Sequence, residues 1–114
     1  MARPSFVELP SRDIAAAKAF YETVFGWEMS DFGPSYASTM TGDVDFGLQA
    51  DPDEMTKAPL PVIAVDDLDA ALAALTAAGG EIVKPIFSFP GGRRFQALDP
   101  NGNEIAVMQP DEKL

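Results

Sequence analysis

The chain contains neither cysteine nor histidine among its 114 residues. Without cysteine it forms no disulfide, no thiolate metal site and no thiol nucleophile. Without histidine it has no imidazole for acid–base chemistry near neutral pH, no imidazole metal ligand and no Ser-His-Asp triad. No apolar run approaches the ~18 residues of a membrane span, and the N-terminus lacks the apolar core of a signal peptide. We therefore expect a cytoplasmic protein without a membrane partner.

Positive charge is scarce as well, with 8 Lys and Arg against 18 Asp and Glu and a formal net charge of −10. Such a charge repels phosphate backbones and anionic membrane surfaces, so nucleic acid is not expected as a partner. The other proportions, 46% hydrophobic and 23% charged, are those of an ordinary globular chain. The length is that of one domain with a core of its own.

Two stretches in different halves of the chain share one pattern. The first, SRDIAAAKAFYETVFGW, has a polar cap at Ser11 or Asp13, an apolar stripe at helical spacing and a stop at Gly26. The second, VDDLDAALAALTAAGG, repeats this plan with Asp67 in the place of Asp13 and Gly80 in the place of Gly26. An internal duplication is the simplest explanation. The expected helices cover residues 14–25 and 68–78.

Short alternating segments between turn signals predict eight strands. They cover residues 6–10, 27–30, 35–40, 44–49, 60–65, 81–85, 93–98 and 104–109, with a Pro/Gly loop at 88–92. Each half therefore has the order β-α-β-β-β, which is too small to be stable alone, so we expect two modules in one α+β domain of residues 1–114. The expected boundaries are about 4–50 for module one, 51–59 for a linker and 60–109 for module two.

Three segments, FVELPSRDIAAAKAFYETVFGW, VIAVDDLDAALAALTAAGG and LDPNGNEIAVMQ, resemble the vicinal oxygen chelate superfamily of glyoxalases, bleomycin resistance proteins and extradiol dioxygenases. They are most similar to its small stand-alone bacterial members. The resemblance implies two βαβββ modules that form an incomplete barrel around a cleft. It also implies a small-molecule ligand in that cleft and a homodimer.

Enzymes of this superfamily hold a metal ion through His or Glu on the first and last strands of each module. Carried over by register, these positions fall on Phe6, Leu60, Ala106 and, more loosely, Gly47. None of these residues is a metal ligand, whereas a metal site needs three or four donor atoms at ~2.0–2.3 Å. We therefore expect no metal cofactor. The alternative is a divalent metal ion held by displaced oxygen donors of Glu8, Gln49 and Glu104.

Glu8 is the most suggestive polar residue, because it stands inside an otherwise apolar strand where an isolated carboxylate is costly. It is expected to pair with Arg93 or Arg94, to contact a ligand, or to act as a catalytic general base. Alternation places it on the inner face of the sheet together with Asp45, Gln49 and Glu104. The candidate ligand-binding residues are Phe6, Glu8, Gln49, Leu60, Phe95, Glu104 and Ala106.

Aromatic residues offer further candidates for the walls of an apolar pocket. Tyr36 and Phe95 are two of them, and Phe87 and Phe89 flank the expected Pro/Gly loop, which would then act as a lid. Trp27 follows the first helix directly and is expected in the core.

Three functions are compatible with these features. The first is metal-free binding of a small molecule in an apolar cleft whose acidic groups favour cationic or neutral ligands. The second is a metal-dependent lyase, isomerase or dioxygenase of the glyoxalase type. The third is a metal-free enzyme in which Glu8 abstracts a proton next to a carbonyl. Metal content separates the second function from the other two.

Overall fold

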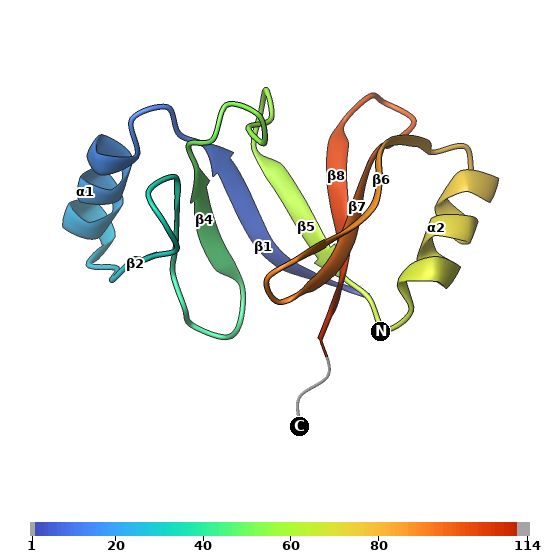
Figure 1. The fold of residues 1–114 in the computed structure, drawn as a ribbon, viewed down its shortest axis with the longest axis horizontal. Coiled ribbons are helices and arrows are strands. Elements are labelled where there is room, and N and C mark those ends of the chain that lie inside the picture. The colour runs from blue at the N-terminus through green and yellow to red at the C-terminus, as the bar shows by residue number, and fades with distance from the viewer. Residues whose placement is uncertain (1, 112–114) are drawn as a thin grey trace. The chain divides into compact units, whose positions relative to one another are not determined.

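The computed structural model describes residues 2–111, which contain two helices and eight strands. The chain divides into two compact units, Phe6–Leu60 and residues 61–111 with 2–5. The first module consists of β1 (Arg3–Pro10), α1 (Ile14–Phe25), β2 (Ser30–Asp31), β3 (Tyr36–Ser38) and β4 (Asp45–Gln49) (Figure 1). The second consists of β5 (Leu60–Ala64), α2 (Leu68–Ala77), β6 (Glu81–Phe89), β7 (Gly92–Leu98) and β8 (Glu104–Pro110). The predicted α+β class with two βαβββ modules is confirmed.

Both modules use the same strand order. In the first, the order is β2-β3-β4-β1, with β1 parallel to β4 and the other pairs antiparallel. In the second, the order is β6-β7-β8-β5, with β5 parallel to β8 and the other pairs antiparallel. The repeated topology agrees with the internal duplication inferred from sequence. Within residues 2–111, neither helix is long and apolar enough to cross a membrane.

The two helices start in the same way. The carboxylate of Asp13 accepts a hydrogen bond from the backbone N–H of Ala16 at 3.0 Å, and that of Asp67 accepts one from Ala70 at 3.1 Å. Each bond satisfies one of the N–H groups that the first helical turn leaves without an internal partner. Of the two candidates for the cap of the first helix, Ser11 and Asp13, it is therefore Asp13 that caps α1.

The helix ends differ by one residue from the predicted duplication. Gly26 ends α1 with a positive φ of 70°, as expected, but after α2 it is Gly79 that takes the left-handed conformation, with φ of 96°. Gly80 serves a different purpose, because a Cβ atom there would collide with the side chain of Leu75. Gly79 therefore allows the left-handed turn that ends the helix, and Gly80 allows the chain to pass close to Leu75.

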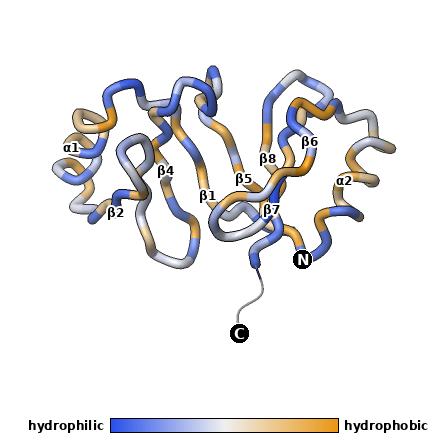
Figure 2. The backbone as a smooth tube through the Cα atoms, viewed as in Figure 1, coloured by the Kyte–Doolittle hydropathy of each residue, from blue (hydrophilic) through white to orange (hydrophobic). Residues whose placement is uncertain are grey.

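The core of the second module lies between α2 and its sheet. Leu68, Phe95, Ala97 and Val107 are buried there in one cluster, with Ile82, Ile86 and Ile105 packed against it. Figure 2 shows α2 mainly in apolar colours and the loop that enters it as hydrophilic. Phe95 belongs to this core.

An aromatic cluster joins α1 to the sheet of the first module. The ring of Trp27 lies 5.8 Å from that of Tyr21 on α1 and 5.3 Å from that of Phe46 on β4. Phe25 stacks on the same indole at 5.0 Å. Trp27, which was expected in the core, is half-buried and packs between the helix and the sheet. This contact also identifies the face of β4 that α1 covers.

The loop predicted at residues 88–92 is not present. Strand β6 continues to Phe89 and β7 begins at Gly92, so that only Pro90 and Gly91 connect them. Gly91 takes the positive φ of 112° that the second position of such a turn requires. A Cβ atom at Gly92 would collide with the backbone carbonyl of Gln109, so the neighbouring strand leaves no room for a side chain. The predicted lid is therefore a tight β-hairpin.

Candidate functional site

Glu8 lies on the face of the first module's sheet that α1 does not cover. In the register of β1 and β4, Val7 pairs with Phe46 and Glu8 pairs with Gly47. Phe46 contacts the aromatic cluster of α1, and neighbours along a strand point to opposite faces, so Glu8 and Gly47 face away from the helix. Only 4% of Glu8 is exposed. A buried carboxylate thus stands on the helix-free face.

Gly47 makes room for Tyr36 beside that carboxylate. A Cβ atom at Gly47 would collide with the hydroxyl oxygen of Tyr36. Strand β3 brings the two residues together, since Tyr36 pairs with Gln49 and Ser38 pairs with Gly47. The phenol therefore lies across the strand next to β1, at the level of Glu8. Together, Glu8, Tyr36 and Gly47 combine a carboxylate, a hydroxyl and a small residue that leaves space.

Two other polar residues of this face are engaged in loops. The side-chain oxygen of half-buried Gln49 accepts a hydrogen bond from the backbone N–H of Asp51 at 3.0 Å. Asp45 accepts hydrogen bonds from the hydroxyls of Thr39 and Thr41 and from two backbone N–H groups of the β3–β4 loop. Burial acts to raise the pKa of Asp45, but these hydrogen bonds outweigh it and hold that pKa below its ordinary value. The ionised Asp45 therefore holds the β3–β4 loop in place through these hydrogen bonds.

A chain of three polar side chains, two buried and one half-buried, crosses the helix-free face of the second module. The guanidinium of Arg94 donates to the side-chain oxygen of Gln96 at 3.0 Å, and the amide nitrogen of Gln96 donates to the carboxylate of Glu104 at 2.7 Å. Arg94 is 6% exposed and Gln96 is fully buried. Buried polar groups of this kind need such partners, because a hydrogen bond lost in the interior is not replaced by water.

Two rings of β6 flank the arginine. The guanidinium carbon of Arg94 lies 5.3 Å from the centroid of the Phe87 ring and 5.6 Å from that of Phe89. Both distances are within the range of cation–π attraction. The strand that replaces the predicted lid therefore places both phenylalanines against a buried cation. Arg93 points to the opposite face, where it forms an ion pair with Asp69 of α2 at 3.7 Å.

One predicted ligand-binding residue, Phe95, was wrongly placed. It belongs to the buried cluster beneath α2, because it pairs with Val107 and alternates with Arg94 and Gln96, which face the other way. On this strand it is Gln96, not among the residues predicted for the site, that lies on the helix-free face. The signal was present, since Gln96 is the polar residue that alternates with the apolar Phe95 and Ala97.

The positions expected to hold metal ligands carry side chains without donor atoms. Leu60 is 1% exposed and Ala106 is fully buried, while Phe6 is half-buried and Gly47 has no side chain. Within residues 2–111, no group of three or more Asp, Glu, His or Cys side chains is placed to hold a metal ion. The donor set thus does not fit a resident metal ion.

Comparisons with known proteins are consistent with this geometry. The model of the Glyoxalase/Bleomycin resistance protein/Dioxygenase superfamily matches residues 3–107. The putative glyoxylase CFP32 of Mycobacterium tuberculosis is 30% identical over 122 residues, which cover 97% of this chain and 47% of that protein. A glyoxylase-like domain-containing protein of Didymella fabae is 32% identical over 115 residues, with 90% of each chain covered. The chain thus spans about half the length of the mycobacterial relative.

Solved structures share the fold at lower identity. The Mn(II)-bound glyoxalase from Novosphingobium aromaticivorans has a TM-score of 0.69 and 22% identity, with 100% of this chain and 43% of that chain covered. A superfamily member from Vibrio splendidus has a TM-score of 0.74 and 19% identity, with 97% and 100% covered.

Proposed function

We propose that this chain, which belongs to the glyoxalase/bleomycin resistance protein/dioxygenase superfamily, binds a small molecule without a resident metal ion. The observation that carries the proposal is Glu8, a carboxylate only 4% exposed on the helix-free face of the first module. In a metal-dependent relative such a group would join other donors. Here the ligand positions around it are occupied by Phe6 and Gly47. Glu8 is therefore the polar anchor for a ligand.

The proposed ligand is cationic or neutral and carries a hydrogen-bond donor. An ionised carboxylate accepts hydrogen bonds and cannot donate one. It therefore selects an amine, amide or hydroxyl over an anion. Tyr36 adds a hydroxyl that both donates and accepts. Phe6, half-buried and two residues before Glu8 on the same strand face, adds apolar surface. A few polar groups among apolar walls are typical of small-molecule sites.

A second candidate function uses the same carboxylate as a general base. A buried Glu beside a tyrosine hydroxyl has the composition needed to abstract a proton next to a carbonyl and to hydrogen-bond the resulting oxyanion. This function also needs no metal. Turnover of a bound carbonyl compound, measured by exchange of its α-proton with deuterium, distinguishes catalysis from binding alone.

Substitution of Glu8 by Gln is expected to change the affinity for a bound amine or amide ligand by about 1–3 kcal/mol, because a charge-assisted hydrogen bond is lost. The measurement is a thermal-shift screen of small amines, amides and alcohols, followed by calorimetric titration of each hit. Glu81→Gln is the matched control, because Glu81 is an exposed carboxylate at the start of β6. Equal affinities in the two variants would contradict a role of Glu8 in binding.

The metal is tested on the same samples. Dialysis against a chelator is expected to leave ligand binding unchanged, and elemental analysis is expected to find less than one transition metal ion per ten chains. About one manganese, zinc, nickel or iron per chain, lost in Glu8→Ala, would instead favour the metal-dependent enzyme.

We further propose a homodimer, since the helix surface of the first module is unusually apolar. Phe20, Val24 and Phe25 of α1 are each more than half exposed, and exposed apolar patches mark interaction sites. Light scattering at tens of micromolar is expected to give twice the chain mass of 12.2 kDa. A mass of one chain at that concentration would rule the dimer out.

A further inference from the structure

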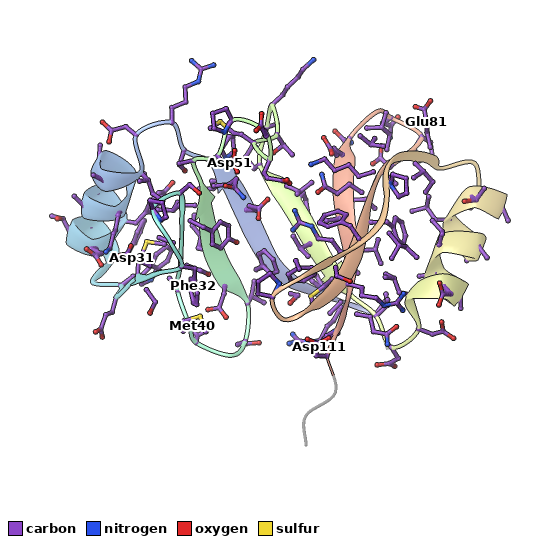
Figure 3. All side chains as sticks on the ribbon, in the orientation of Figure 1. Asp31, Phe32, Met40, Asp51, Glu81 and Asp111 are labelled. Atoms are coloured by element: carbon purple, nitrogen blue, oxygen red, sulfur yellow. The ribbon has the colours of Figure 1, made fainter. Side chains whose placement is uncertain are left out.

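We propose that a second site, a cavity at the end of β1 and β4, binds a small organic anion. The cavity has a volume of about 730 Å³ and lies within the unit Phe6–Leu60. We call it the linker cavity, because much of its lining comes from the segment that follows β4. Its lining includes Pro10, Arg12, Pro52, Met55, Thr56 and Lys57. Figure 3 labels Asp51 at this end of the module.

The charge of the linker cavity is unusual for this chain. Among residues 2–111, Arg12 and Lys57 are the basic residues whose side chains make no ion pair, hydrogen bond or aromatic contact. In a chain with a net charge of −10, carboxylate partners are plentiful. Both of these cations are exposed, and both line the same cavity. Two cations beside one hollow favour an anionic group there.

Two acidic residues close to the cavity in sequence have partners of their own: the carboxylate of Asp13, adjacent to Arg12, caps α1, and Asp51 lies in the turn that follows β4. A carboxylate oxygen of Asp51 accepts a hydrogen bond from the backbone N–H of Asp53 at 3.0 Å, and the carbonyl of Asp51 accepts those of Glu54 and Met55 at 3.1 and 2.9 Å. These bonds hold Asp51 within its own turn. Arg12 and Lys57 are both exposed, so a ligand in the cavity can reach them.

The wall of the linker cavity is ordered before any ligand arrives. The backbone N–H of Ser11 donates to the carbonyl of Gln49 at 2.8 Å, which joins the ends of β1 and β4. The hydroxyl of Thr56 donates to the carbonyl of Ala58 at 2.7 Å and fixes the end of the segment. Pro10 and Pro52 have restricted backbones of their own. A preformed wall reduces the ordering cost of binding.

These features define the class of ligand. The volume is within the ~300–1,000 Å³ of small-molecule sites, so more than a single ion is accommodated. Pro10, Pro52 and Met55 offer apolar contact, and the two cations offer charge. We infer a carboxylate or phosphate head group on a small apolar body. This inference does not rest on the proposed function at Glu8, and either one stands if the other fails.

The test is a titration of the ¹⁵N-labelled protein with phenyl phosphate and with benzoate, followed by NMR. Saturable shifts of amide signals are expected from residues 11–12 and 50–57, and loss of affinity is expected at high salt. Arg12→Gln and Lys57→Gln are each expected to weaken binding about fivefold, equivalent to ~1 kcal/mol for an exposed charge contact. Phenyl phosphate and benzoate show whether the head group is a phosphate or a carboxylate.

Lys18→Gln is the matched control, because it removes the same charge from the surface ion pair with Asp31. It is expected to bind the two anions as the unchanged protein does. Neutral benzyl alcohol is expected to produce no saturable shifts at these residues. Three results would overturn the proposal: no saturable shifts with either anion, equal weakening by Lys18→Gln, or equal affinity for benzyl alcohol.

Discussion

Substitution of Leu68 by Ala is expected to lower the free energy of unfolding by about 2–5 kcal/mol, the range for truncating a fully buried leucine. Leu68 is the first residue of α2 and has no exposed surface. Its side chain contacts the buried cluster of Phe95, Ala97 and Val107. Because the shortened side chain leaves a cavity between helix and sheet, the loss includes both transfer and packing contributions.

A urea titration measures this loss, with Val83→Ala as control. Val83 on β6 is 45% exposed. Its replacement by Ala is therefore expected to lower the free energy of unfolding by less than ~1 kcal/mol. The side-chain oxygen of Gln109 accepts a hydrogen bond from the backbone N–H of Leu68 at 2.9 Å, and the substitution leaves this contact in place. A loss no larger than that of Val83→Ala would show that α2 is not anchored through Leu68.

Features set by local sequence were the most predictable. Helix 14–25 was predicted to the residue, and helix 68–78 differs from the structure at its last residue only. Both helices follow from a capping aspartate and from apolar residues at 3.6-residue spacing. These signals depend only on residues within one or two helical turns. The order of elements along each module, β-α-β-β-β, was predictable from the repeated pattern, whereas the order of the strands within each sheet was not predicted.

The β6–β7 hairpin was mispredicted because turn residues were read as a longer loop. Ser88-Phe89-Pro90-Gly91-Gly92 contains three residues that commonly break strands. Here the cross-strand pairs Phe87 with Arg94 and Phe89 with Gly92 extend the ladder up to the turn. Gly92 pairs because its missing side chain lets the carbonyl of Gln109 approach. Such a requirement comes from the neighbouring strand, which local sequence does not reveal.

The candidate site was predictable in part. Alternation correctly separated Glu8 from Val7, since the helix covers one face of β1. Phe95 was assigned to a ligand pocket for its aromatic character alone, which fits a core equally well, and it lies in the core. The polar chain of Arg94, Gln96 and Glu104 was missed as a unit, because hydrogen bonds between strands depend on register. Whether Glu8 contacts a ligand remains a prediction.

Breaking the polar chain of Arg94, Gln96 and Glu104 is also expected to have a large effect on stability. Arg94→Ala is expected to lower the free energy of unfolding by about 2–4 kcal/mol, because it removes a buried hydrogen bond and two cation–π contacts together. The side-chain oxygen of the fully buried Gln96 would lose the hydrogen bond that the Arg94 guanidinium donates to it at 3.0 Å. Leaving a buried polar group without its partner costs more than the net value of the bond that is lost.

The adjacent Arg93 provides a strict control, because it differs from Arg94 in the face on which it lies. Its ion pair with Asp69 spans 3.7 Å between side chains that are 41% and 75% exposed, so Arg93→Ala is expected to cost less than ~1 kcal/mol. Arg94→Lys keeps the charge but not the planar fork, and is expected to fall between the two alanine variants. Urea titrations of all three variants give the order directly. If Arg93→Ala and Arg94→Ala were equally stable, burial and ring contacts would contribute nothing, and the polar chain would have no structural role.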